Sequence, residues 1–578
     1  KIGLFKRGAF FFPEGGAQVG PALLAFTRLL DAARRGERYV RVEGGDFVEI
    51  ERELFERLQQ AELCAFDGNT APKLSPAALP FWLRQLGDVC AGGDAESSAL
   101  AERARDEDRA GSELPLPQEL EHVLRNYQRD GVRFLATRAR FSPGALLADE
   151  MGLGKTLQSI ALLSLRAQLG PAMVVCPTSL VDNWCEELAR FAPGLRVLRY
   201  RGAKRRALLP ALAPGAVLVL SYELLARDRP QFEQRAFATQ VLDEAQLMRN
   251  ARTQRARAAA SLNVAFRVAL SGTPLENRLG DVWSLFQLLT PGLLGSWPRF
   301  RARFAVPIER YDDRERSAAL WQLIAPLMLR RRKDDVAAEL PQRTEVVHMV
   351  ALSPAERELY QSALADARRA LGKRSQHDPG RRMHVLAELT RLRQLACHPR
   401  LLIDDTRVES SKLASLMGLL GDVLPRGHRV LIFSQFVAHL ALVREALTRA
   451  DIDWLWLSGS TPPGERAALV ERFQTGAVPV FLISLKAGGT GLNLTAADYV
   501  VHMDPWWNPS AQDQASDRAH RIGQSRPVSV IKLVAQDTIE ERVLLLHGHK
   551  RRLAQQVIEG REVELEPDNP AWEALLQR

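Results

Sequence analysis

Two separate stretches of the chain repeat one pattern, a short apolar run followed by a segment with the spacing of an amphipathic helix. The runs in residues 118–295 are GALLA, AMVVCP, AVLVLSY, QVLDEA and RVALSG, and those in residues 429–535 are RVLIFSQF, WLWLSG, VFLISL, YVVHMD and VSVIKLVA. Strands buried on both faces of a parallel sheet have this pattern, and helices cover the two faces. The sequence therefore predicts an α/β protein with two doubly wound parallel-sheet lobes.

The rest of the chain fits around these two lobes. At 578 residues it is too long for one hydrophobic core. A stretch rich in Ala, Glu, Asp and Arg before residue 115 reads as a linker. The predicted parts are an accessory N-terminal region of unclear fold with a hairpin at residues 39–50 (1–115), a first lobe (116–295), helical insertions and an inter-lobe segment (296–425), a second lobe (426–537), and a C-terminal bracing helix with a tail (538–578).

Composition excludes several classes of protein. Hydrophobic residues make up 46% and charged residues 25%, which are ordinary globular proportions. No run approaches the roughly 20 apolar residues that span a bilayer, so we expect a soluble, cytoplasmic protein without a membrane partner. The five cysteines form no C-x-x-C pair, and His398 beside Cys397 has no further ligand at metal spacing, so no zinc site is expected. The net charge of +9 favours a polyanionic partner.

The strongest local motif is ADEMGLGKT, residues 148–156, which lies between an expected strand and an expected helix. Small residues let backbone N–H groups approach phosphates, and the helix N-terminus attracts their charge. Lys155 would reach the β- and γ-phosphates of a nucleotide, and the Thr156 hydroxyl would bind Mg²⁺. The strict Walker A pattern has Gly where this chain has Asp149, and the alternative is a glycine-rich turn with an exposed lysine.

A second motif, VLDEAQ, follows another buried strand 88 residues after Lys155. Asp243 would hold Mg²⁺, and Glu244 would polarise the water that attacks the γ-phosphate. A lone Asp-Glu pair is also typical of an acidic helix cap. That alternative does not explain why the pair accompanies a phosphate-binding loop, so together the motifs predict an ATP site.

Further motifs occur in one order along residues 118–560, and together they resemble the Swi/Snf-type family of helicase-like ATPases in helicase superfamily two. They are NYQRDGVRFL, DEMGLGKT, VVCPTSLVDNW, LSYELL, LDEAQ in the place of a DEAD/DEAH-like box, LSGTPLENRLGDVWSLF, LRRRKDDV, RLRQLACHPRLL, RVLIFSQF, LSGST, SLKAGGTGLNLTAADYVV, DPWWNP and QASDRAHRIGQ. The resemblance implies two RecA-like lobes that hydrolyse ATP with Mg²⁺. It also accounts for Asp149, because this family uses an acidic residue there.

The resemblance also implies roles for individual residues. Arg518 and Arg521, spaced three apart on an expected helix, would be arginine fingers contributed by the second lobe. Gln246 replaces the histidine that is frequent in the family. The residues implied for nucleotide binding are Gln128, Asp149, Gly152, Gly154, Lys155, Thr156, Gln246 and Gly491, and those implied for coupling hydrolysis to the rest of the lobe are Ser271, Gly272 and Thr273.

DNA contacts are expected on loops near strand ends, where hydroxyls, amides and cations can reach phosphates. The candidates are Thr178, Ser179, Arg331, Arg332, Lys486, Gly488, Gly489 and Thr490. Thr178 or Ser179 would also cap the following helix. For Trp506 and Trp507 we expect packing at the lobe junction rather than stacking on bases.

The function implied is an ATP-dependent translocase on double-stranded DNA that does not separate the strands. The alternatives are a strand-separating helicase and a nucleotide-gated DNA-binding scaffold. The bias toward Ala, Leu and Arg is typical of a high-GC bacterial source, where such a motor would associate with the nucleoid and with proteins of DNA repair, transcription or phage defence.

Overall fold

The computed structural model describes residues 2–7, 10–19, 22–42, 46–63, 65–67, 72–95, 98–99, 102, 118–272, 279–337, 339–372, 381–488, 492–545 and 547. They form two compact units, each described by itself below. The first unit contains Lys1–Glu150 and Gly154–Arg332, and the second contains Met151–Leu153 and Lys333–Leu553. Within the described residues the four cysteines (Cys90, Cys176, Cys185 and Cys397) form no disulfide, and no helix is long and apolar enough to cross a bilayer.

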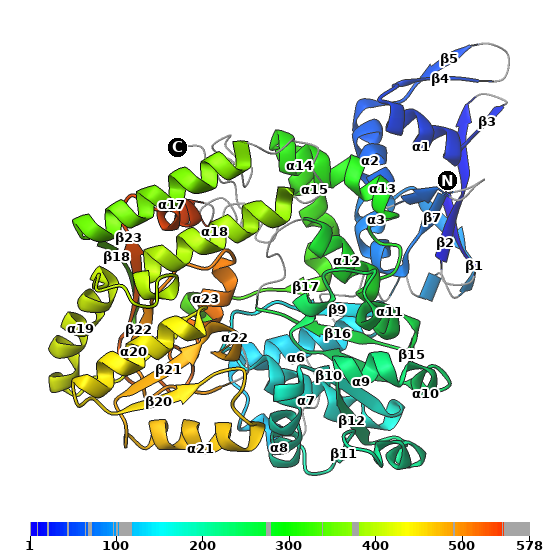
Figure 1. The fold of residues 1–578 in the computed structure, drawn as a ribbon. Coiled ribbons are helices and arrows are strands. Elements are labelled where there is room, and N and C mark those ends of the chain that lie inside the picture. The colour runs from blue at the N-terminus through cyan, green and yellow to red at the C-terminus, as the bar shows by residue number, and fades with distance from the viewer. Residues whose placement is uncertain are drawn as a thin grey trace. The chain divides into compact units, whose positions relative to one another are not determined.

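The main sheet of the first unit has seven parallel strands in the order β11-β12-β10-β14-β16-β9-β17 (Figure 1). Five of them are the predicted apolar runs: β9 (Gly144–Leu147), β10 (Ala172–Cys176), β12 (Ala216–Ser221), β14 (Thr239–Leu242) and β16 (Arg267–Leu270). The two outermost strands, β11 (Arg196–Arg199) and β17 (Met328–Leu329), were not predicted.

Every residue of the five predicted strands is buried, which shows that both faces of this sheet are covered. Alternate strand residues such as Leu147, Val174 and Val219 share one core cluster with side chains of the helices α6 (Asn126–Arg138), α7 (Lys155–Leu165) and α8 (Val181–Phe191). Strands β10 and β12 also contact α9 (Tyr222–Arg227), and strands β9 and β16 contact α12 (Leu279–Leu289). The doubly wound arrangement predicted for a RecA-like lobe is confirmed.

The N-terminal region has its own mixed sheet, in the order β6-β7-β2-β1-β8 with β3 beside β2. Its strands are β1 (Ile2–Arg7), β2 (Phe10–Val19), β3 (Ala22–Ala25), β6 (Ala65–Asp67), β7 (Pro72–Leu74) and β8 (Cys90–Gly93), and its helices are α1 (Phe26–Arg35), α2 (Arg52–Leu63) and α3 (Leu79–Leu86). The predicted hairpin is present as β4 (Tyr39–Arg41) and β5 (Phe47–Glu49). The boundary predicted at residue 115 lies outside the described residues and stays a prediction.

One buried carboxylate joins this region to α13 (Trp297–Phe300) and to the π-helical segment Arg301–Ala305 of the same unit. This segment leads into α14 (Val306–Tyr311) and α15 (Arg314–Ile324). Glu62, at the end of α2, is 4% exposed. It accepts hydrogen bonds from Arg34 Nε (3.1 Å), Arg299 Nη2 (2.9 Å) and Arg303 Nη2 (2.5 Å). Arg303 Nη1 also donates to the Glu62 and Leu63 carbonyls. The accessory region is therefore attached to the rest of its unit through specific ionic contacts.

The sheet of the second unit has six parallel strands in the order β18-β23-β22-β19-β21-β20. The predicted runs are β19 (Val430–Ser434), β20 (Trp454–Leu457), β21 (Val480–Ser484), β22 (Tyr499–His502) and β23 (Val528–Ala535). The edge strand β18 (Arg343–Val350) lies in a segment predicted to be mostly helical.

Helices surround this second sheet. They include α16 (Lys333–Val336), α17 (Pro354–Gly372), α18 (Arg381–Cys397), α19 (Ser411–Val423), α20 (Val437–Arg449), α21 (Pro463–Gln474), α22 (Leu485–Gly488) and α23 (Pro509–Ser516). The predicted C-terminal helix is helical over residues 539–545 and at 547, and its remainder lies outside the described residues. Its Ile539 and Val543 are buried, as the apolar spacing predicted, whereas Leu545 is exposed.

Candidate active site

The predicted nucleotide and coupling residues line up along one edge of the first sheet. The carboxyl ends of parallel strands lie at the same edge of a sheet, and this edge is where ligands bind in open α/β folds. The phosphate-loop motif follows β9, Ser271 follows β16, Asp243 follows β14 and Thr178 follows β10, and these strands are consecutive in the sheet. Residues separated by more than one hundred positions therefore become neighbours.

The loop between β9 and α7 has the backbone of a phosphate cradle. Gly152 and Gly154 adopt φ angles of 87° and 74°, in the left-handed region that favours glycine. Lys155 begins α7, and its Nζ curls back to donate to the carbonyls of Asp149 (2.6 Å) and Glu150 (3.1 Å). Thr156 is the next residue of the same helix. Lys155 and the hydroxyl-bearing Thr156 thus lie at the N-terminus of the helix, where the backbone dipole attracts phosphate.

Asp149 has a structural role in this loop. Its side chain is fully buried and binds Arg331 in a fork, with Nε 3.0 Å from Oδ1 and Nη2 2.5 Å from Oδ2. Arg331 also donates to Gln158 Oε1 (2.8 Å) and stacks on the Tyr127 ring. These contacts occupy the guanidinium inside the first unit. The geometry therefore favours a structural role for Arg331 over the predicted DNA contact, and Asp149 supports the loop from beneath.

Gln128 lies against the loop, as a residue that contacts the nucleotide must. It is 3% exposed, its Oε1 accepts from the Arg125 backbone N–H, and its Nε2 lies 3.4 Å from the Tyr127 hydroxyl. A Cβ added to Gly154 would come within 2.3 Å of Gln128 Nε2. Gly154 is therefore required both by its φ angle and by the space that Gln128 fills.

Asp243 is a half-buried carboxyl whose pKa lies near neutrality. Its Oδ2 accepts from Trp184 Nε1 (2.8 Å) and its Oδ1 from the Glu244 N–H (2.9 Å), while the Tyr222 hydroxyl donates to its carbonyl (2.6 Å). Burial, with the nearby charge of Glu244, raises the pKa of Asp243 to about 7. The hydrogen bond from Trp184 and the charge of Lys155 act in the opposite direction. A cation at this carboxylate would favour its ionised form.

The donor set fits Mg²⁺. This ion prefers hard oxygen ligands and one or two protein contacts beside the nucleotide phosphates. The Thr156 hydroxyl and the Asp243 carboxylate are such oxygens, placed after β9 and β14 at the same sheet edge. When bound, the ion neutralises charge on the phosphates.

Glu244 is linked to the coupling motif through Gln246. Gln246 Nε2 donates to Glu244 Oε2 (2.5 Å), and Ser271 Oγ donates to Gln246 Oε1 (2.9 Å). Glu244 itself has φ 51° and ψ 51°, a left-handed conformation that costs free energy in a non-glycine residue and is frequent at functional sites. The amide of Gln246 thus bridges the carboxylate expected to activate water and the strand end expected to sense hydrolysis.

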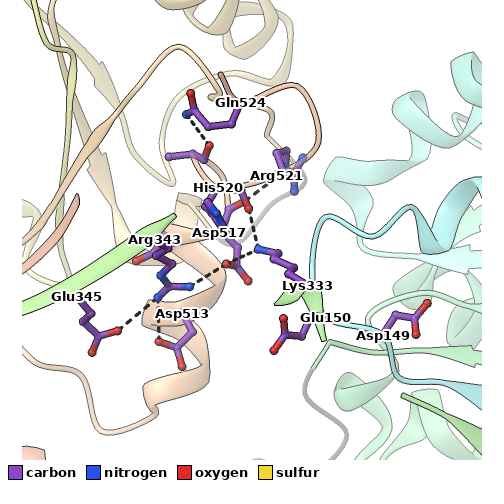
Figure 2. Close-up of polar contacts among 12 residues, drawn as sticks. Asp149, Glu150, Lys333, Arg343, Glu345, Asp513, Asp517, His520, Arg521 and Gln524 are labelled. Carbon is purple, nitrogen blue, oxygen red and sulfur yellow. Dashed lines mark hydrogen bonds and ion pairs between the residues drawn. The ribbon is translucent and has the colours of Figure 1, made fainter. Parts of the chain in front are cut away.

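In the second unit, Arg518 and Arg521 lie on a turn rather than on the expected helix. The helix α23 ends at Ser516, and residues 517–523 form successive turns. In this segment the Asp517 carboxylate binds Lys333 and Arg343 (Figure 2). The Gln524 amide donates to the carbonyls of Thr495, Ala497 and Ala519. The expectation that the arginines share a helix face is wrong. Arg518 is 1% exposed, and Arg521 is half-buried.

One candidate DNA residue of the first unit, Thr178, borders a hollow at the same sheet edge. Thr178 and Ser179 are exposed just after β10, and Thr178 Oγ1 donates to Glu223 (3.1 Å). Neither side chain caps the helix that follows, so the predicted capping role is wrong. The hollow measures about 380 Å³ and is lined by Thr178, Val181, Tyr200, Arg201, Gly202, Arg205, Ser221, Leu224 and Arg227. Sequence analysis missed the three arginines, which carry no motif of their own.

Other predicted contacts are placed less fully. Arg332 is half-buried, and Lys486 is exposed on α22, which ends at Gly488. Thr273, Gly489, Thr490 and Gly491 lie outside the described residues, whereas Gly272 is described at the end of the segment after β16.

A buried polar cluster surrounds Cys397 in the second unit. Donor atoms of Cys397, His439 and Asp504 lie within 4.8 Å of one another. Lys412 Nζ lies 2.5 Å from Glu540 Oε2, and Arg393 Nη2 lies 3.8 Å from Asp504 Oδ2, so each carboxylate already faces a cation. His398 caps a short turn through the Arg400 N–H, which is the structural role expected for it.

Trp506 and Trp507 both pack around the guanidinium of Arg393, with ring centres 5.3 and 4.8 Å from its Cζ. Arg393 is 2% exposed. The two rings therefore pack within the second unit, and their predicted place at the lobe junction stays a prediction.

Two family models match this chain in adjoining segments. The SNF2-related domain matches residues 127–401, and the helicase conserved C-terminal domain matches residues 411–523. The chain belongs to the SNF2-related family. Its two units thus carry the helicase-like ATPase core that the ordered motifs predicted.

Relatives of this family occur in bacteria and animals. The chain is 38% identical over 453 residues to the putative ATP-dependent helicase/translocase YwqA of Bacillus subtilis, covering 76% of this chain and 49% of the relative. It is 35% identical over 477 residues to the mouse chromodomain-helicase-DNA-binding protein 1-like, covering 78% and 52% respectively. The chain therefore spans about half the length of these relatives.

Among solved structures, the SWI2/SNF2 ATPase core of Sulfolobus solfataricus in complex with dsDNA is 34% identical, with a TM-score of 0.39 over 76% of this chain and 93% of that one. A second structure, of the Sulfolobus solfataricus SWI2/SNF2 ATPase core domain, is 34% identical, with a TM-score of 0.37 over 75% and 90% of the two chains.

Proposed function

We propose that this protein is a DNA-stimulated ATPase that translocates along double-stranded DNA without separating its strands. The observation that carries the proposal is the continuous row of groups at the carboxyl edge of the first sheet. Lys155, Asp243 and Glu244 form the nucleotide half of the row, and Thr178 with the arginine-lined hollow forms the other half. Asp243 and the helix after Thr178 are joined directly, because Trp184 on that helix donates to the carboxylate.

The chemistry of the nucleotide half is hydrolysis. Lys155 and the loop amides would bind the phosphates, and Glu244 would orient and deprotonate the attacking water. Gln246 holds the Glu244 carboxylate through a hydrogen bond to its Oε2. Arg518 and Arg521 stay proposed arginine fingers, whose guanidinium groups would stabilise charge that develops on the γ-phosphate.

The proposed DNA half suits a backbone reader. Arg201 and Arg227 line the hollow beside the exposed Gly202, and guanidinium groups with hydroxyls recognise phosphates without reading base sequence. Arg205 lines the hollow as well, but its guanidinium binds the Asp228 carboxylate. The mouse relative is named as a DNA-binding protein and YwqA as a helicase/translocase, which supports DNA as the partner and movement as the output here. Exposed Lys486 in the second unit is a further proposed contact.

The test separates the three candidate functions. ATP hydrolysis is measured with and without duplex DNA, followed by triplex displacement, which reports translocation, and by release of a labelled strand, which reports unwinding. The proposal expects stimulation by duplex and displacement of the third strand without strand release. Strand release would show a helicase. The third candidate is tested with Glu244→Gln. If this variant lost ATP hydrolysis and still performed the protein's function in the cell, the protein would be a nucleotide-gated scaffold.

A further inference from the structure

Lys333 is a buried lysine at the point where the second unit begins after the first in the sequence. It is the first residue of α16 and 5% exposed. Its Nζ donates to Asp517 Oδ1 and to the His520 carbonyl, both at 2.7 Å (Figure 2). A lysine is rarely buried unless it is paired, since desolvation of the ammonium is costly. Both partners belong to the turn that carries Arg518 and Arg521.

The same turn receives two further contacts from the segment that follows Lys333. Arg343 Nη1 lies 3.0 Å from Asp517 Oδ1, the oxygen that Lys333 binds. His520 Nε2 lies 2.8 Å from the Pro341 carbonyl. Burial lowers the pKa of His520, so the ring is neutral, and because a carbonyl only accepts, Nε2 carries the proton. Residues 333–343 therefore hold the turn at Asp517 and at His520.

These two points bracket the arginines. Asp517 immediately precedes Arg518, and its carbonyl accepts from Arg521 Nε at 3.4 Å. His520 immediately precedes Arg521. On the opposite side, the Gln524 amide ties the turn to the carbonyls of Thr495 and Ala497 in the core of the unit. The position of the arginine-bearing turn is thus set by Gln524 from within the lobe and by Lys333 from the connecting segment.

Lys333 makes the contact that the neighbouring charges cannot replace. Arg343 divides its guanidinium between Asp517, Asp513 (3.7 Å) and Glu345 (3.5 Å). Lys333 alone among these cations also binds the His520 carbonyl. Without the Lys333 ammonium, the Asp517 carboxylate keeps Arg343 as a partner, and the His520 carbonyl loses its hydrogen bond from Lys333.

We propose that Lys333 is a positioning residue for the arginine fingers: its ammonium, bound to Asp517 and to the backbone of His520, holds Arg518 and Arg521 where they can act on the γ-phosphate. The inference rests on the proposed function, because the position of the turn matters for rate only if these arginines take part in hydrolysis. Misplacing a catalytic group by about 1 Å costs up to ~10²-fold in rate. ATP binding, which depends on Lys155, should not change.

The experiment compares Lys333→Met with Lys532→Met in the full chain. Lys532 is a matched control, since it is 4% exposed in the same unit and pairs with Glu345 instead of the arginine turn. We measure kcat and KM for duplex-stimulated hydrolysis, affinity for a fluorescent ATP analogue, and Tm. Lys333→Met should lower kcat by about 10- to 100-fold with unchanged affinity for the analogue, and Lys532→Met should keep kcat.

Two further variants distinguish positioning from a general loss of stability. If Lys333 acts through the arginines, Lys333→Met combined with Arg521→Ala should be no slower than Arg521→Ala alone, because residues that act as a unit are not additive. Lys333→Arg, which keeps the charge, should restore part of kcat. Wild-type kcat in Lys333→Met, or fully additive losses in the double variant, would overturn the inference. Absence of hydrolysis in the wild-type protein would instead refute the proposed function.

Discussion

The raised pKa of Asp243 makes a quantitative prediction about how nucleotide binding depends on pH. A protonated carboxyl cannot ligate a metal ion, so Mg²⁺-dependent binding requires the ionised form. With a pKa of about 7, ionised Asp243 rises from roughly a tenth of the molecules at about pH 6 to roughly nine-tenths at about pH 8. The Mg²⁺-dependent part of the affinity for ATP should therefore increase about tenfold over this interval.

The sign of the effect can be checked independently. Because the folded pKa lies above the usual 3.8, the nucleotide-free protein binds a proton that the unfolded chain has released. This group's contribution to stability is therefore fully present below about pH 4 and declines as pH rises toward about 7. Saturating Mg²⁺ and ATP should oppose that decline, so the increase in Tm on adding them should be larger at about pH 8 than at about pH 6.

The assay is titration of a fluorescent ATP analogue at saturating Mg²⁺ and, in parallel, with a chelator. Trp184→Phe removes the hydrogen bond that lowers the pKa of Asp243, so its pH profile should move to higher pH. Asp243→Asn cannot ionise and should bind weakly at every pH. If the wild-type profile were flat, or if Asp243→Asn kept the same pH dependence, another group would be titrating and the reasoning would fail.

Other predictions follow from single contacts. Lys155→Ala should abolish nucleotide binding in the same titration, whereas Arg521→Ala should keep binding and lower kcat by ~10³-fold or more. Gln246→Ala should break the bridge between Glu244 and Ser271, and Ser271→Ala should have the same effect. Both variants should therefore lose stimulation by duplex DNA more than basal hydrolysis. Equal losses of the two rates would contradict a coupling role. Duplex affinity should fall steeply with salt and vary little with sequence, and a flat salt titration would exclude backbone binding. Glu62→Ala should lower the free energy of unfolding by about 2 kcal/mol, measured by denaturant titration, because three partly buried arginines lose their carboxylate.

Sequence reasoning found the apolar strands, including the edge strand β20, and missed the polar edge strands β11 and β18. Strands β10, β12 and β21 are buried on both faces, so they read as unbroken apolar runs. The edge strands β11 (RVLR) and β18 (RTEVVHMV) have exposed and charged positions, and such segments carry no comparable apolar signal. In the N-terminal region, β1 and β2 likewise mix buried and exposed positions, which is why its fold could not be predicted.

The site shows a similar division. The phosphate loop and the Asp243–Glu244 pair are contiguous motifs, so local sequence identified them. The basic run at residues 330–333 illustrates what sequence cannot give. Arg331 faces Asp149 and Lys333 faces Asp517, partners 182 and 184 residues away, and the local sequence indicated only Arg331 and Arg332 as candidate DNA contacts. The turn at Arg518 was read as a helix because the distant partners of Asp517 and His520 cannot be seen in the local pattern.

The cluster at Glu62 bears on how shortened versions of this protein would behave. A version starting at residue 116 would retain the motor motifs and lose the carboxylate that neutralises Arg299 and Arg303. Those two side chains would then present uncompensated positive charge on the surface of the remaining protein, where it would attract nucleic acid of any sequence. Tighter DNA binding by such a fragment would therefore come from the two arginines that Glu62 neutralises in the full chain. It would not show that the N-terminal region inhibits DNA binding.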